Sequence, residues 1–129
     1  MNERKDFLRI ELSHYDLDTA EALLASGRYL YVGFMSHQAI EKILKAYFVS
    51  VKNETAPFSH SLSHLAKKSG IFEKFLEEQI DFIDMLEPLN IETRYPSHKE
   101  ELFKSLTKER SAEIFNKTRS LQKWIKAKL

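Results

Sequence analysis

Residues 28–53 constrain the fold most strongly, because apolar side chains recur there at three- and four-residue steps over the length of a long helix. These side chains are Val32, Met35, Ala39, Ile40, Ile43, Leu44, Tyr47, Phe48 and Val51. On a helix they cover an arc too wide for packing on one side only. The pattern therefore predicts a second helix that is central in a bundle or that lies at a dimer interface.

The segment before it predicts a first amphipathic helix from Asp6 to Ser26, which Gly27 ends. Its apolar positions also follow helical spacing, and we expect them to form the face that packs on the core. They are Leu8, Leu12, Tyr15, Ala22 and Leu23.

A loop is expected at 53–57, because Pro57 is not tolerated in a helix interior. Ser59 or Ser61 then caps a short helix that Gly70 ends.

The second half of the chain predicts a helix from Phe72 up to Pro88 and a last helix that starts at Thr107 or Ser111. Residues 89–106 show no clean period and are expected to be irregular. With only three Gly and three Pro in the chain, a many-stranded sheet would lack the residues for its tight turns. We therefore expect one all-α domain over 1–129, with four main helices and one short helix.

Several classes of protein are excluded by composition. The chain contains no cysteine, so disulfide frameworks and thiolate metal sites are ruled out. No apolar run reaches the 18 residues of a membrane span and no secretory stretch follows Met1–Asp6, so a cytoplasmic protein without membrane contact is expected. The formal net charge of +1 argues against nonspecific DNA binding, and no sequence-specific DNA binding is expected either.

The charge is nevertheless unevenly distributed. Residues 73–87 hold six acids against Lys74, whereas 117–128 hold basic residues and no acid. These two segments could attract each other within a bundle, although charged runs usually lie in solvent.

Common catalytic templates are missing, and three polar groups remain as candidates. His60 and His64 are four residues apart and would share a helix face, but two ligands do not make a metal site, so no bound metal is predicted. Gln38, Glu41 and Lys45 lie among residues of the second helix that should pack, and Glu41 and Lys45 are spaced for an ion pair.

The third group lies in the segment predicted to be irregular. Arg94, Tyr95 and His98 combine a guanidinium for phosphate, a ring for stacking and a titratable imidazole, which suits RNA.

Taken together, three stretches of the chain resemble the HEPN domain family. They are His37–Ala46, His60-Ser61-Leu62 and Thr93-Arg94-Tyr95-Pro96, in this order and followed by a helical segment with Trp124. The resemblance implies an up-and-down helical bundle that dimerises, similar to the substrate-binding domain of antibiotic nucleotidyltransferases. It also implies a minimal nucleotidyltransferase as partner in a toxin–antitoxin pair.

Many HEPN proteins are metal-independent endoribonucleases that use an arginine and a histidine from each subunit. Those members place four to six residues between the two, whereas only three separate Arg94 from His98 here, with Pro96 among them. The resemblance therefore implies Arg94 and His98 as the catalytic pair, although their spacing is shorter than in those members.

Our leading hypothesis is a homodimer through the second and last helices that is not an enzyme by itself and needs no cofactor. It would bind a nucleotide or its nucleotidyltransferase partner through Gln38, Glu41, Lys45, Arg94 and Tyr95. One alternative is a ribonuclease toxin using Arg94 and His98, and another is a scaffolding bundle whose polar groups satisfy one another.

Overall fold

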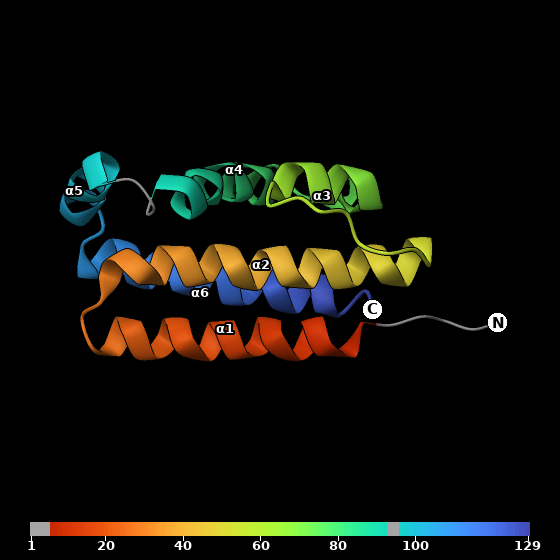
Figure 1. Cartoon of the computed structure of the whole chain (residues 1–129), viewed down its shortest axis with the longest axis horizontal. Coiled ribbons are helices and arrows are strands. Elements are labelled where there is room, and N and C mark those ends of the chain that lie inside the picture. Colours follow the sequence, from red (N-terminus) through yellow and green to blue (C-terminus); the bar gives the residue numbers. More distant parts are fainter. Residues whose placement is uncertain (1–5, 93–95) are drawn as a thin grey trace.

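The computed structural model describes residues 6–92 and 96–129, and within these ranges every regular element is helical. The elements are α1 (Phe7–Ala25), α2 (Tyr29–Lys52), α3 (Leu62–Ser69), the 3₁₀ turn η1 (Ile71–Lys74), α4 (Glu77–Glu92), α5 (Pro96–Ser105) and α6 (Lys108–Lys126). Figure 1 shows α1 and α4 running opposite to α2 and α6, with α1 below and α3 and α4 above the middle pair. The predicted all-α bundle is confirmed.

Helix α2 occupies the centre of this bundle. It contacts α1, α3, α4, α5 and α6, and most of its side chains are buried. Of the two explanations for its wide apolar arc, a central position is therefore sufficient, because helices of the same chain cover it.

Two groups of buried apolar side chains form most of the core. The larger one joins α2, α3, α4 and α6 and includes Leu44, Leu65, Ile83 and Ile125. A smaller group joins α1 to α2 and α6 around Leu17. Helix α2 thus lies between two apolar layers and contributes to both.

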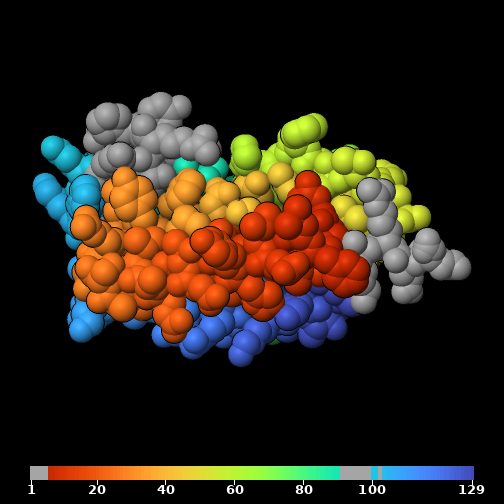
Figure 2. All heavy atoms as spheres, turned by 60° about the horizontal axis from the view of Figure 1, so that its bottom comes forward, coloured from red at the N-terminus to blue at the C-terminus, as the bar shows by residue number. Residues whose placement is uncertain are grey.

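Helix α1 forms where the sequence predicts it, but of its five predicted apolar positions Leu23 is the one that packs against the core. Leu8, Leu12 and Tyr15 are exposed, with Leu8 at 66% and Tyr15 at 68%. The buried residues are Ser13, Asp16, Leu17 and Ala20. Figure 2 shows α1, in red and orange, along the front of the molecule with no other helix in front of it. The exposed stripe thus repeats with helical period on the side facing away from the core.

The two polar residues on the buried face of α1, Ser13 and Asp16, both have hydrogen-bond partners on α2. The Ser13 hydroxyl donates to the Ala39 carbonyl at 2.7 Å, and Lys42 Nζ donates to Asp16 Oδ2 at 2.5 Å. Burial of such groups is tolerated when they are hydrogen-bonded.

The helix ends follow the predicted turn chemistry. Helix α2 ends at Asn53 in the left-handed region, with φ of 54°, and α3 ends at Gly70, with φ of 88°. The hydroxyls of Ser61 and Thr107 accept hydrogen bonds from the backbone N–H groups of His64 and Arg110, which caps α3 and α6. Of the alternatives open in the sequence, Ser61 and Thr107 are the caps.

Three predictions for the second half were wrong. Helix α4 begins at Glu77 and not at Phe72, because residues 71–74 form the separate turn η1 and Phe75 is extended. Helix α4 continues through Pro88 to Glu92, and residues 96–105 form α5, where an irregular segment was expected. Leu86 and Leu89 on either side of Pro88 are buried. Their packing keeps the helix intact although Pro88 has no N–H to donate. Pro96 is the first residue of α5, a position where the lacking N–H costs nothing.

Within the described ranges, no helix is both long and apolar enough to cross a membrane.

Candidate ligand-binding site around Glu41

Glu41 is a nearly buried carboxylate on α2, 5% exposed, that gathers three nitrogen-bearing side chains. Lys45 Nζ lies 3.2 Å from Oε2. His60 Nδ1 lies 3.1 Å from Oε2 and 3.2 Å from Oε1, and His37 Nδ1 lies 3.8 Å from Oε1. We refer to His37, Glu41, Lys45 and His60 as the Glu41 cluster.

Helical spacing and one loop contact assemble this cluster. His37, Glu41 and Lys45 are four residues apart on α2, so they follow one another along one face. The fourth member, His60, comes from the loop immediately before the Ser61 cap of α3. The predicted ion pair between Glu41 and Lys45 is present in the structure.

The cluster is buried at its base and open at one corner. The side chains of Glu41 and Lys45 are 7% and 12% exposed, whereas that of His60 is 65% exposed. Removing a carboxylate from water costs several kcal/mol unless charged and hydrogen-bonding groups surround it, as they do here. Since His60 Nδ1 is taken by the carboxylate, its Nε2 is the ring nitrogen left for a ligand.

Two further polar contacts join α2 to α4 and to α1. Gln38 Nε2 donates to Asn90 Oδ1 at 2.9 Å, and Asn90 lies on α4 with 2% exposure. Lys42 is held by Asp16 of α1. Gln38, Glu41 and Lys45 are three and four residues apart on α2, so they lie along one strip of this helix.

The pair of histidines considered for metal binding is not arranged as the spacing suggested. His60 precedes the cap residue Ser61, whereas His64 lies inside α3, so the two do not share a helix face. Among the residues that the structure describes, no three His, Asp or Glu side chains are grouped so as to hold a metal ion.

The family model for the HEPN domain matches residues 8–128. The chain belongs to the HEPN domain family. One similar solved structure, that of TT1696 from Thermus thermophilus, has a TM-score of 0.79 at 20% identity and covers 94% of this chain and 95% of that one. The comparison with curated proteins gave no match.

At 20% identity the likeness to TT1696 shows that the two chains share a fold. The function of this HEPN domain has to be inferred from its own residues.

Three HEPN candidates from the sequence cannot be placed beside the cluster. Arg94 and Tyr95 lie outside the described residues. His98 is in the first turn of α5, but its side chain is also outside the described part.

Sequence reasoning missed His60 as a member of the Glu41 site. The contact joins residues 19 positions apart and depends on how the loop after α2 folds back. The spacing of residues along one helix cannot predict such a contact, although the HEPN resemblance did include His60-Ser61-Leu62.

Chemically, the cluster of this HEPN domain offers a carboxylate, an ammonium and an imidazole within contact of one another. The Lys45 ammonium is paired with Glu41, so a phosphate has to compete with a carboxylate there. The outward imidazole nitrogen of His60 meets no such competition and can donate to or accept from a ligand. His60 is accordingly the first contact we expect a polar ligand to make.

Proposed function

We propose that this HEPN domain is a binding module for a nucleotide or a single-stranded RNA, and that its binding surface is the Glu41 cluster with Gln38, extended by Arg94 and Tyr95. The observation that carries the proposal is the burial of Glu41 among three nitrogen-bearing groups with only His60 open to solvent. A buried ion pair is often no more stabilising than apolar side chains of similar size, because both charges lose their hydration, so stability alone is a weak reason for the arrangement.

The side chains of this proposed surface suit different parts of a nucleotide. Phosphate is repelled by Glu41, so its contacts fall to His60 and Arg94, and Arg is suited to bidentate phosphate binding. The carboxylate of Glu41 suits a ribose hydroxyl, which donates hydrogen bonds. Tyr95 supplies a ring on which a base can stack.

The test is titration of the protein with ATP and with a short single-stranded RNA, for wild type and for His60→Ala and Arg94→Ala. We expect each variant to bind about tenfold more weakly, the equivalent of one charge-assisted hydrogen bond. His64→Ala is the matched control, because His64 is exposed on α3 and forms no side-chain contact with the cluster.

Either of two results would count against this site. Equal affinities of His60→Ala and His64→Ala would remove His60 from it. Absence of binding to both ATP and RNA by the wild type would contradict the proposed function as a whole.

We further propose that the domain works with a minimal nucleotidyltransferase in a toxin–antitoxin pair, as the HEPN resemblance implies. Support for this comes from family membership alone. Co-expression with a nucleotidyltransferase encoded next to it should give a complex that purifies together, and two separately eluting proteins would contradict the pairing.

A metal-independent ribonuclease is the second candidate. This candidate is supported by the start of α5 at Pro96. The backbone of His98 then belongs to a helix and not to a loop. In such a reaction the 2′-hydroxyl of RNA loses its proton to a base and attacks the adjacent phosphorus, while Arg94 stabilises the charge that develops there. The bond from phosphorus to the 5′-oxygen of the next nucleotide breaks, this oxygen takes up a proton, and a 2′,3′-cyclic phosphate remains.

RNA cleavage in the presence of a chelator distinguishes this candidate from the binding module. Cleavage by the wild type that both Arg94→Ala and His98→Ala lose would establish the ribonuclease. A protein that binds RNA without cutting it would leave the binding module.

A further inference from the structure

The outward face of α1 is apolar where a surface helix is normally polar. Phe7 is 67% exposed and Leu12 37%, beside the exposed Leu8 and Tyr15. Leu8, Leu12 and Tyr15 are four and three residues apart, so they follow one another along one side of the helix. We refer to these three residues with Phe7 as the α1 stripe.

The buried side of the same helix is the more polar one at this level. Ser13 and Asp16 are 0% and 4% exposed, and both bond to α2. The fold therefore keeps two polar side chains inside and the α1 stripe in water, at a cost of about 25 cal/mol for each Å² of apolar surface left exposed. Apolar side chains that gather in one exposed patch, unlike scattered ones, mark an interaction surface.

No other described helix of the chain covers the α1 stripe. Helix α1 packs on α2 and α6 through its opposite side, which holds Leu17 and Ala20. Figure 2 shows α1 in front, with α2 above it and α6 below it. A group that covers the stripe therefore has to come from another molecule.

The exposed charges along the outward face of α1 are acidic. Glu11 and Asp18 lie one turn before and one turn after Tyr15, and Glu21 follows in the next turn. All three are exposed, and none forms an ion pair or a hydrogen bond with another side chain that the structure describes. The bases on α1 or in contact with it bind other groups: Arg9 bonds to Asp6, Lys42 to Asp16 and Lys126 to His14.

We propose that the outward face of α1 is a docking site for a basic amphipathic helix of a partner protein. The apolar side of that helix packs on the α1 stripe, and its lysines or arginines pair with Glu11, Asp18 and Glu21. The proposal rests on α1 alone and is independent of the Glu41 cluster.

The size of the face sets the expected affinity. From Phe7 to Glu21 it is about 21 Å long, which matches a partner helix of about four turns. One helix docked on another covers less than the ~800 Å² per partner of a standard interface. We therefore expect a micromolar dissociation constant that rises with salt, because the rim is charged.

The acids argue against two other occupants. A second copy that docked its α1 on this α1 would place Glu11 and Asp18 against like charges. An anionic lipid surface would be repelled in the same way. The homodimer that the sequence predicts through α2 and α6 stays a separate prediction, because it does not use α1.

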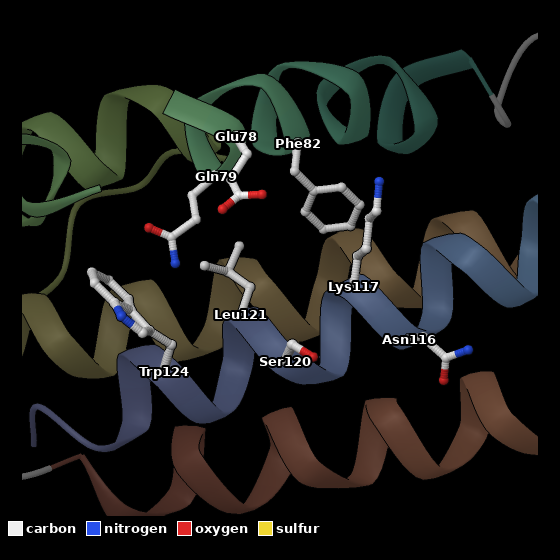
Figure 3. A pocket seen from close by; sticks show the side chains of 8 residues that line it. All are labelled: Glu78, Gln79, Phe82, Asn116, Lys117, Ser120, Leu121 and Trp124. Atoms are coloured by element: carbon white, nitrogen blue, oxygen red, sulfur yellow. The ribbon is translucent and has the colours of Figure 1, made fainter. Parts of the chain in front are cut away.

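A groove between α4 and α6 lacks this preference for basic partners. It has a volume of about 420 Å³ and an apolar base that includes Phe82. Figure 3 shows Glu78 on its α4 wall and Lys117 on its α6 wall, and Lys117 pairs with Glu113 at 3.5 Å. No ion pair joins α4 to α6 among the described residues, so the attraction that the sequence suggested is not used. With both signs of charge present, this groove supplies controls.

Fluorescence anisotropy of the full chain with two labelled peptides tests the proposal. Both peptides are helices of about five turns with leucines at three- and four-residue steps, and their polar positions carry lysine in one and glutamate in the other. Wild type should bind the lysine peptide at least about tenfold more tightly than the glutamate peptide.

Two double variants separate the apolar and the charged contributions. Leu8→Gln/Tyr15→Gln should weaken binding of the lysine peptide by at least about tenfold, because it removes apolar contacts. Glu11→Lys/Asp18→Lys should lose the lysine peptide and gain the glutamate peptide.

Leu76→Gln and Glu78→Lys on the side of α4 are matched controls, because both residues are exposed and lie away from α1. They should bind the lysine peptide as wild type does, and circular dichroism should show the same helix content in all variants. A wild type without preference for the lysine peptide overturns the proposal, and so does equal binding by the α1 variants and the controls. Self-association that the Leu8→Gln/Tyr15→Gln variant loses, or binding to phosphatidylserine vesicles in place of the peptide, would overturn it in favour of a second copy or a membrane.

Discussion

The fold lowers the pKa of His14, a half-buried residue of α1. Its Nε2 lies 2.8 Å from Lys126 Nζ, which joins α1 to the end of α6. Burial lowers the pKa of His14, the positive charge of Lys126 lowers it further, and Asp18 opposes these effects in part. The neutral imidazole accepts a hydrogen bond from the ammonium, whereas a protonated ring would repel it.

A pH dependence of folding follows from this lowered pKa. Below the ordinary value of about 6.5, the unfolded chain takes up a proton at His14 more readily than the folded protein does. The free energy of unfolding should therefore fall as the pH drops below that value. Urea denaturation from about pH 7.5 to about pH 5 should show a smaller fall for His14→Gln, whose amide can still accept from Lys126. Parallel curves for the two proteins would show that His14 does not contribute.

At the same scale, the Glu41 site shows which contacts a sequence can reveal. The pair of Glu41 and Lys45 was predictable, because four residues along a helix fix the direction of both side chains. The contact of His60 with Glu41 was not, because it depends on the path of a loop. The partner of Gln38, Asn90 on α4, depends likewise on which helices lie next to each other.

Among the elements, α1 explains how a correct helix can be assigned the wrong face. Its strongest apolar period, through Leu8, Leu12 and Tyr15, points to solvent. The buried side includes Ser13 and Asp16, which lower its apparent hydrophobicity while their hydrogen bonds are satisfied inside. The spacing of the apolar residues therefore predicted the helix correctly. Hydrogen bonds to α2 determine which face of α1 is buried.

Proline placement explains the other errors at the element scale. Pro96 was taken as part of an irregular segment but begins α5, and Pro88 was taken as a helix end but lies within α4. Proline strongly disfavours the interior of an isolated helix. Burial of Leu86 and Leu89 outweighs that cost in the folded chain.

Replacement of Pro88 tests this account of α4. Pro88→Ala restores an N–H that can bond to the Asp84 carbonyl and removes the clash of the ring with that carbonyl. Allowing for the greater freedom of the unfolded chain, we expect the free energy of unfolding to rise by about 1–2 kcal/mol, measured by urea denaturation.

Pro57 in the loop after α2 provides the control, because no helical hydrogen bond is missing there. Pro57→Ala should leave stability unchanged or slightly lower. If Pro88→Ala instead destabilised the protein, a bend at Pro88 would be required for the packing of α4 against α2.

On the scale of the whole molecule, α4 joins the Glu41 cluster to the opposite end of the bundle. Asn90 near its end contacts the strip of α2 that carries the Glu41 cluster, while Glu78 and Phe82 near its start line a groove between α4 and α6.

Helix α2 also determines how the whole molecule should unfold, because it belongs to both apolar layers of the core. Leu44 on α2 is fully buried in the larger layer, whereas Val51 on the same helix is 46% exposed. Leu44→Ala should lower the free energy of unfolding by about 3–5 kcal/mol, and Val51→Ala by no more than about 0.5 kcal/mol.

Hydrogen exchange shows whether the two layers unfold together. If α2 couples them, Leu44→Ala should reduce the protection of α1 by the same free energy as that of α3 and α4, although α1 adds only the partly buried Ile10 to the layer that contains Leu44. Val51→Ala should leave all of these helices protected. Full retention of protection in α1 would mean that its small layer around Leu17 with α2 and α6 is a separate folding unit, and that α2 supports both layers without coupling them.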